Sequence, residues 1–250
     1  MSVANQSVTE TLSNLTLSEI VTKNFKAAAV FEHYNLDFCC RGNKPLNSAC
    51  EEKGIDPAQV LSDLSDLFTL PSESNGRYDE WNLDFLSDYI VYNHHSYVRN
   101  MIPLIAAHTQ KVAAVHGKNH PETIEAAKIF TIVYKDLKQH MMKEEEILFP
   151  YIKQLVKAAR NSSKTEKPYF GTVENPIKMM EAEHQSAGDE MFELRRITNN
   201  YTPPEDACNT FKICYKELKE FEEDLHKHVH LENNILFPKA IVLEKTLVAA

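Results

Sequence analysis

The chain has 250 residues, of which 43% are hydrophobic and 25% charged, a composition typical of a folded globular protein with a sizeable core. The formal net charge of −9 argues against a general nucleic-acid-binding protein, because phosphate contacts need clustered lysine and arginine side chains. No apolar run reaches the roughly 20 residues of a membrane span and no basic-then-apolar leader opens the chain, so neither a membrane protein nor a secreted one is expected.

The N-terminal residues 1–70 predict a small helical unit that carries a pair of cysteines. Ser18 is a candidate N-cap for its first helix, and Asp56 followed by proline is a typical start for its last. The expected segments are a polar tail over residues 1–14, a helix from 17 to about 34, a loop over 35–43, short helices over 46–53 and 57–68, and a linker over 71–82 that is rich in turn-forming residues.

The rest of the chain, residues 83–245, predicts a bundle of long helices. Only six glycines occur, strand-like alternation is scarce, and breaks rich in Gly, Pro and Asn separate the helical stretches. The four expected helices cover residues 83–115, 121–158, 173–199 and 205–245. Four long helices with short connections make an all-α four-helix bundle the expected architecture.

A repeated motif marks the second and fourth helices. Residues 140–150 read HMMKEEEILFP and residues 228–238 read HVHLENNILFP, so each begins with His, has Glu four residues later, and ends in Ile-Leu-Phe-Pro. An upstream histidine precedes each motif, His95 by 45 residues and His184 by 44. The resulting set is His95, His140, Glu144, His184, His228 and Glu232. This pattern predicts two related helical hairpins that surround two metal ions.

The spacing has a physical reason, because residues four apart lie on one face of a helix. Each motif falls on an apolar stripe of period three to four. The stripes are Phe130, Val133, Leu137, His140, Glu144, Leu148 and Tyr151; then Ile177, Met180, His184, Ala187, Met191 and Leu194; then Cys214, Leu218, Phe221, Leu225, His228, Glu232 and Ile235. Single core histidines with hydrogen-bonding partners would be the plainer interpretation. The duplication favours metal, since a buried carboxylate costs several kcal/mol unless a cation neutralises it.

The ligand types favour iron or manganese, because imidazole and carboxylate are borderline-to-hard ligands, although zinc remains compatible. Two histidines per metal plus two bridging carboxylates give each metal four ligands. An oxo or hydroxo bridge would add a fifth and leave one open position per metal for O₂, nitric oxide or peroxide.

Two choices stay open on periodicity alone. His94 and His95 each lie on an apolar face of the first helix, and the spacing favours His95 slightly. Asp136 and Asp224 each lie one turn before a motif histidine, where a carboxylate either accepts the free ring N–H of that or a neighbouring histidine or is simply solvated.

Five cysteines, an odd number with two adjacent, do not form a typical disulfide framework, so the reducing cytoplasm is the expected compartment. Cys39 and Cys40 are candidate catalytic thiols, because Arg41 beside them can favour a thiolate. The alternative is that one packs as a small apolar residue and the other is exposed. Cys50, Cys208 and Cys214 are expected to be structural.

Over nearly its whole length the sequence resembles the iron–sulfur cluster repair di-iron proteins, a family of the hemerythrin-like superfamily. The N-terminal part resembles the family's cysteine-bearing domain through NLDFCCRGN. The bundle resembles its hemerythrin-like domain through HHSYVRNMIP, HMMKEEEILFP, EAEHQSAG and HLENNILFP. By this similarity the iron ligands are His95, His140, Glu144, His184, His228 and Glu232, and the family's cysteine pair corresponds to Cys39 and Cys40.

The resemblance implies a function, repair of iron–sulfur clusters damaged by nitric oxide or oxidants, with damaged cluster proteins as partners. Iron donation is the expected activity, and nitric oxide reduction at a centre of two irons is a further one, so whether the protein is an enzyme stays open. Similar proteins are cytoplasmic and often dimeric, which allows a homodimer. The alternative is a hemerythrin-type protein that binds or senses O₂ or iron.

Overall fold

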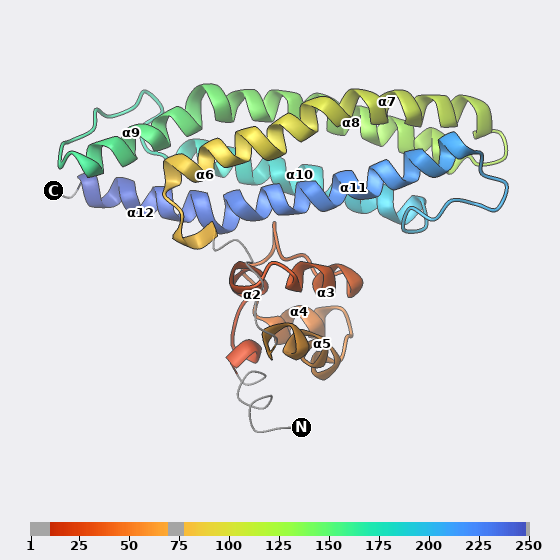
Figure 1. Ribbon diagram of the computed structural model, residues 1–250, viewed down its shortest axis with the longest axis horizontal. Coiled ribbons are helices and arrows are strands. Elements are labelled where there is room, and N and C mark those ends of the chain that lie inside the picture. The colour runs from red at the N-terminus through yellow and green to blue at the C-terminus, as the bar shows by residue number, and fades with distance from the viewer. Residues whose placement is uncertain (1–10, 70–77, 249–250) are drawn as a thin grey trace. The chain divides into compact units, whose positions relative to one another are not determined.

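The computed structural model describes residues 11–69 and 78–248, and within these ranges the regular secondary structure is helical (Figure 1). The all-α prediction is therefore confirmed. The chain divides into two compact units. One comprises residues 1–82 together with Val229–Pro238, and the other comprises Leu83–His228 together with Lys239–Ala250. Much of the expected linker, residues 71–82, and most of the expected polar tail lie outside the described residues.

From residue 17 to residue 69 the N-terminal part contains the short helices α2 (Leu17–Lys23), α3 (Ala27–His33), α4 (Leu46–Glu52) and α5 (Pro57–Thr69). The prediction of one helix from 17 to 34 is wrong, because Asn24 adopts an extended backbone with φ of −151°. Its side chain donates a hydrogen bond to the carbonyl of Leu67 and accepts one from the backbone N–H of Lys26. These contacts of a polar side chain with the backbone replace the helix and separate α2 from α3.

The N-cap of the first helix lies two residues before the expected Ser18. Thr16 is the N-cap, and it forms a capping box with Glu19 in which each side chain bonds the other residue's backbone N–H. Ser18 lies within the first turn instead.

The C-terminal part is a bundle in which four long helical rods run alongside one another (Figure 1). The first rod contains α6 (Leu83–Ile90), η2 (Val91–His95) and α7 (Ser96–His116), and the second contains α8 (Glu122–Lys143), η3 (Glu144–Leu148) and α9 (Phe149–Arg160). The third is α10 (Glu174–Ile197), and the fourth contains α11 (Asn209–Leu231), η4 (Glu232–Leu236) and α12 (Phe237–Val248). A short 3₁₀ turn, η1 (Tyr78–Glu80), precedes them.

The core of the bundle follows the stripes expected from the sequence. Every residue assigned to the three stripes, including the four histidines and glutamates of the repeated motifs, is at most 5% exposed. Burial of these side chains, at roughly 25 cal/mol per Å² of apolar area, is the main force that holds the rods together.

Three of the rods contain a five-residue π-helical turn, and three of the six expected metal ligands lie on these turns. His95 ends η2, whereas Glu144 begins η3 and Glu232 begins η4. Pro150 and Pro238 follow η3 and η4 closely. A proline has no N–H to donate and its ring collides with the carbonyl four residues earlier, so a widened turn relieves the clash. Such π turns are frequent at functional sites.

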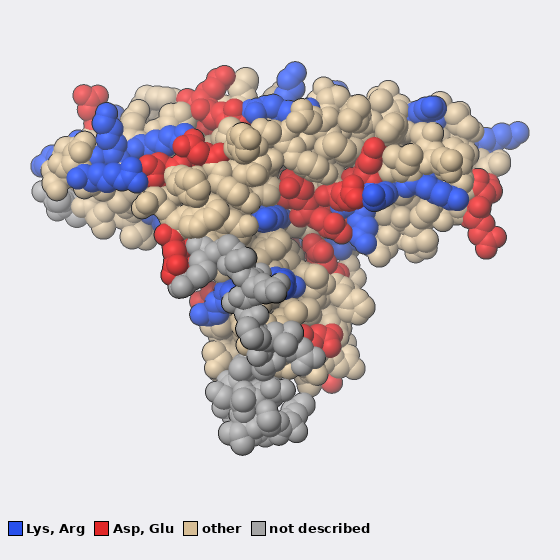
Figure 2. Space-filling view, in the orientation of Figure 1, with Lys and Arg blue, Asp and Glu red and all other residues tan. Residues whose placement is uncertain are grey.

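The surface of the bundle is mixed in charge. Figure 2 shows Lys and Arg side chains intermixed with Asp and Glu across the visible face. Among the described residues, no helix combines the length and the apolarity that a membrane span requires.

Candidate metal centre

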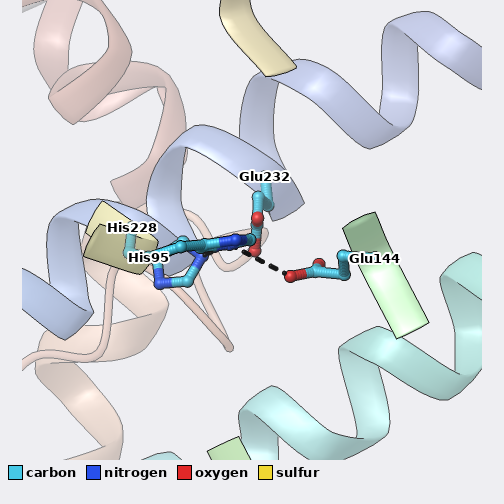
Figure 3. Close-up of side chains that lie close together, drawn as sticks. All are labelled: His95, Glu144, His228 and Glu232. Atoms are coloured by element: carbon cyan, nitrogen blue, oxygen red, sulfur yellow. Dashed lines mark hydrogen bonds and ion pairs between the residues drawn. The ribbon is translucent and has the colours of Figure 1, made fainter. Parts of the chain in front are cut away.

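Six buried side chains in the bundle form two overlapping groups. His95, Glu144, His228 and Glu232 make the first group (Figure 3), and His140, Glu144, His184 and Glu232 make the second. Within each group the nitrogen and oxygen atoms that can bind a metal lie within 4.8 Å of one another. The two carboxylates, Glu144 and Glu232, belong to both groups, so the structure brings together all six residues singled out in the sequence.

The ring nitrogens face each other at short range. Nε2 of His95 lies 3.2 Å from Nε2 of His228, and Nε2 of His184 lies 2.9 Å from Nε2 of His140. Oε2 of Glu144 lies 3.3 Å from Nε2 of both His95 and His140. A metal that bonds imidazole nitrogen at about 2.1 Å holds neighbouring ligands roughly 3.0–3.4 Å apart. The observed distances therefore match those between neighbouring ligand atoms of one metal.

Two outer carboxylates fix the orientation of two of the imidazoles. Nδ1 of His95 lies 2.6 Å from Oε1 of Glu145, and Nδ1 of His140 lies 2.9 Å from Oε2 of Glu183. An N–H on Nδ1 that donates to a carboxylate leaves the lone pair on Nε2, directed toward the centre. The basic side chains Arg99 and Lys143 each pair with one of these outer carboxylates.

The same contacts alter the acidity of one outer carboxylate. The hydrogen bond with His140 and the contact with Lys143 together lower the pKa of Glu183 to about 2, against the opposing effect of partial burial. Glu183 is therefore ionised near neutral pH and holds the proton of His140 on Nδ1.

The arrangement fits a metal on chemical grounds. Two carboxylates that are 0% exposed converge with the ring nitrogens of four buried imidazoles. A buried carboxylate is costly unless a cation neutralises it, and four imidazoles with two carboxylates are a borderline-to-hard ligand set.

The sequence did not identify the carboxylates that contact His95 and His140. Asp136 and Asp224 were the candidates, and Asp224 lies 2.9 Å from Nδ1 of a neighbouring histidine, His94, which is outside the six. His94 is buried, and its ring stacks on that of His228 at 5.7 Å between centroids. The carboxylates that contact His95 and His140 come from residues adjacent to ligands in sequence, Glu145 beside Glu144 and Glu183 beside His184. The run of three glutamates, Glu144, Glu145 and Glu146, was a sequence feature that indicated a further carboxylate beside the ligand Glu144.

The cysteine pair lies in the loop between α3 and α4. Cys39 is buried and Cys40 is half-buried, and all five cysteines of the chain are free thiols. The hydrogen bond with Cys40, together with burial, raises the pKa of Cys39. This direction opposes the thiolate expected from the neighbouring Arg41. Of the three cysteines expected to be structural, Cys50 and Cys214 are buried but Cys208 is exposed.

Comparison with known proteins then gives the family. Residues 87–240 match the hemerythrin HHE cation binding domain, and residues 13–67 match a domain of unknown function, DUF542. A protein of Haemophilus influenzae named "Probable iron-sulfur cluster repair protein" is 35% identical over 228 residues, 90% of this chain and 96% of that protein. Proteins named "Iron-sulfur cluster repair protein YtfE" from Musicola paradisiaca and Escherichia coli O8 are 37% and 34% identical, over 90% and 91% of this chain and 95% and 97% of their own lengths. The chain belongs to this hemerythrin-like repair family.

Family membership confirms the resemblance found in the sequence and accounts for the bundle. The buried groups described above lie within residues 87–240, the range that matches the cation-binding domain. The position of the candidate metal centre is therefore the one that the family match indicates. The cysteine loop lies within the other matched domain, residues 13–67.

Proposed function

We propose that this chain carries two iron ions and repairs iron–sulfur clusters damaged by nitric oxide or oxidants, with iron donation as its main activity. The observation that carries the proposal is the sharing of Glu144 and Glu232 by two groups of potential ligands. Two carboxylates shared in this way provide bridges between two metals, and each metal then has two histidines of its own. The names of the relatives support the choice of damaged cluster proteins as partners.

The assignment of ligands follows the two groups. His95 and His228 would hold one iron, His140 and His184 would hold the other, and Glu144 and Glu232 would bridge them. An oxo or hydroxo bridge would complete the pair and leave an open position on each iron for a small ligand such as nitric oxide or O₂. Iron is favoured over zinc by two shared carboxylates in a donor set of imidazole and carboxylate that lacks thiolate.

The protein's residues also determine how readily the iron cargo leaves. None of the six residues is a cysteine, and the two carboxylates bind a ferrous ion less strongly than a ferric one because the metal charge is lower. Glu145 and Glu183 hold the imidazoles of His95 and His140 in the binding tautomer in both states. The site is therefore suited to tight storage of ferric iron and release on reduction.

The cytoplasm is the proposed compartment, and a homodimer is the proposed assembly. Five free thiols suit a reducing cytoplasm, and the protein would meet its damaged partners there. A homodimer is part of the proposal by analogy with similar proteins.

The test is a repair assay with an enzyme inactivated by nitric oxide damage to its cluster. The iron-loaded protein should restore activity, whereas iron-free protein and Glu144→Gln protein should not. Restoration by the iron-free protein would contradict iron donation. Nitric oxide consumption, measured in the same samples with an added reductant, would reveal reductase chemistry, and reversible oxygenation without repair would favour an O₂-binding protein.

A further inference from the structure

A second cluster of metal-binding atoms lies in the cysteine loop. Asp37, Cys39 and Cys40 place one carboxylate oxygen and two sulfurs within 4.8 Å of one another. Sγ of Cys39 lies 3.8 Å from Sγ of Cys40 and 3.4 Å from Oδ1 of Asp37. None of these residues belongs to the six-residue centre of the bundle.

The spacings are those of ligands around one tetrahedral ion. Such an ion bonds sulfur at about 2.3 Å and carboxylate oxygen at about 2.0–2.2 Å, which separates two sulfurs by about 3.8 Å and a sulfur from an oxygen by about 3.5 Å. The observed 3.8 Å and 3.4 Å match both values. Two adjacent thiols can also form a disulfide, but that bond places the two sulfurs about 2.05 Å apart, whereas these lie 3.8 Å apart.

The loop holds this arrangement by its own backbone. Oδ1 of Asp37 accepts hydrogen bonds from the backbone N–H groups of Cys39 at 3.1 Å and Cys40 at 2.9 Å, a turn that fixes the carboxylate beside the thiols. The flanking side chains Leu36 and Phe38 are 3% and 2% exposed and anchor the loop in the core of its unit. The ligand atoms are therefore held in place before any ion binds.

The end of the loop passes so close to the backbone of Phe38 that only glycine fits at position 42. A Cβ atom on Gly42 would lie 2.1 Å from the carbonyl oxygen of Phe38, a contact that no side chain permits. The backbone N–H of Ser18 donates to the carbonyl of Gly42 at 2.9 Å and ties the end of the loop to α2.

We propose that Asp37, Cys39 and Cys40 form a separate site for one thiophilic divalent ion of the zinc or ferrous iron class. Two thiolates and one carboxylate supply three ligands, and an external ligand fills the fourth position. Cys40 is half-buried, which gives the ion access from solvent. Binding releases the two thiol protons to solvent, so the site changes from two neutral thiols to two metal-bound thiolates. This site stands on its own residues and does not depend on the proposed repair function.

The experiment is a titration of the full-length, iron-loaded protein with Cd²⁺, with the thiols kept reduced by a phosphine. The readout is the sulfur-to-metal charge-transfer absorption, which imidazole and carboxylate ligands do not produce. We expect one equivalent of Cd²⁺ per chain with this signal, and displacement of the signal by added Zn²⁺. Cys39→Ser and Cys40→Ser should each abolish it. Asp37→Asn should weaken binding about ten-fold, because the amide oxygen still accepts the two backbone hydrogen bonds but no longer carries charge.

Cys208→Ser is the matched control, because Cys208 is exposed and lies 3.2 Å from Nε2 of His116, where it could bind a soft metal independently. The signal should persist in this variant. No charge-transfer signal in the natural protein, or a signal that Cys208→Ser removes while Cys39→Ser and Cys40→Ser retain it, would overturn the proposal. Equal affinity in Asp37→Asn would remove the carboxylate from the site. Unchanged iron content in Cys40→Ser would show that the bundle is intact, so loss of the signal reports on the loop alone.

Discussion

At the scale of single residues, the proposal of two metals depends on Glu144 and Glu232. Each is fully buried and each belongs to both groups of ligands. Their positions were predictable from the sequence, because a carboxylate four residues after a histidine on an apolar stripe lies on the same helix face. The outer carboxylates were less predictable, since a helix-by-helix analysis does not show which neighbouring rod a polar side chain will meet.

Replacing a shared carboxylate should reduce the metal content. We expect Glu144→Gln, which keeps the shape and removes the charge, to lower iron from about two per chain to one or fewer and to lower the unfolding temperature of the loaded protein. Metal analysis after anaerobic purification measures this. Glu146→Gln, an exposed glutamate on the same turn, is the control and should keep the full content. Full iron in both Glu144→Gln and Glu232→Gln would show that these residues are not the bridge.

Removing an outer carboxylate should weaken the site without removing a ligand. In Glu183→Gln the hydrogen bond to Nδ1 of His140 loses its charge, and we expect metal affinity to fall by about 10- to 100-fold. Competition with a chelator measures the affinity. Glu193→Gln, on the same helix but paired with Arg196 at the surface, should bind like the natural protein. If the two variants are equal, Glu183 does not position His140.

At the scale of elements, the four rods and their buried faces could be predicted and their local irregularities could not. Helical periodicity placed every rod within a few residues of its observed ends. The break at Asn24 depends on a hydrogen bond to Leu67, more than 40 residues away, which no local pattern reveals. The π turns had a signal in Pro150 and Pro238, but periodicity alone treats each rod as a regular helix.

The connections at one end of the bundle give a pH-dependent contribution to stability. The hydrogen bond with Asp206 raises the pKa of His120 above its ordinary value of 6.5, and the same bond lowers the pKa of Asp206 below 3.8. The contribution of His120 to the free energy of unfolding is fully present below pH 6.5 and is lost as pH rises through the raised pKa. The aspartate's contribution is present above pH 3.8 and is lost as pH falls through the lowered pKa.

His120→Gln should therefore lower the unfolding temperature at about pH 5.5 and have less effect at about pH 8.5. Calorimetry at the two pH values measures the difference from the natural protein. His33→Gln, at an exposed histidine in the other unit, should show no such pH dependence. The same loss at both pH values for His120→Gln would exclude an ion pair as the cause.

At the scale of the whole molecule, the proposed function requires the protein both to hold iron and to give it up. Reduction lowers the metal charge and weakens the carboxylate bonds, so we expect iron transfer to a chelator to speed up about ten-fold or more, a barrier change of about 1.4 kcal/mol. Iron loss from oxidised and reduced protein, timed with one chelator at one pH, measures this. Equal rates would contradict release on reduction and would favour small-molecule chemistry at the open positions.

The central claim is that six residues of the bundle, His95, His140, Glu144, His184, His228 and Glu232, hold a pair of irons. Iron analysis with Mössbauer spectroscopy on anaerobically purified protein tests it most directly, because coupling between two bridged irons is visible in the spectrum. The structure predicts about two irons per chain and the spectrum of a magnetically coupled ferric pair in the oxidised state. One iron per chain, uncoupled iron, or zinc in its place would contradict the claim.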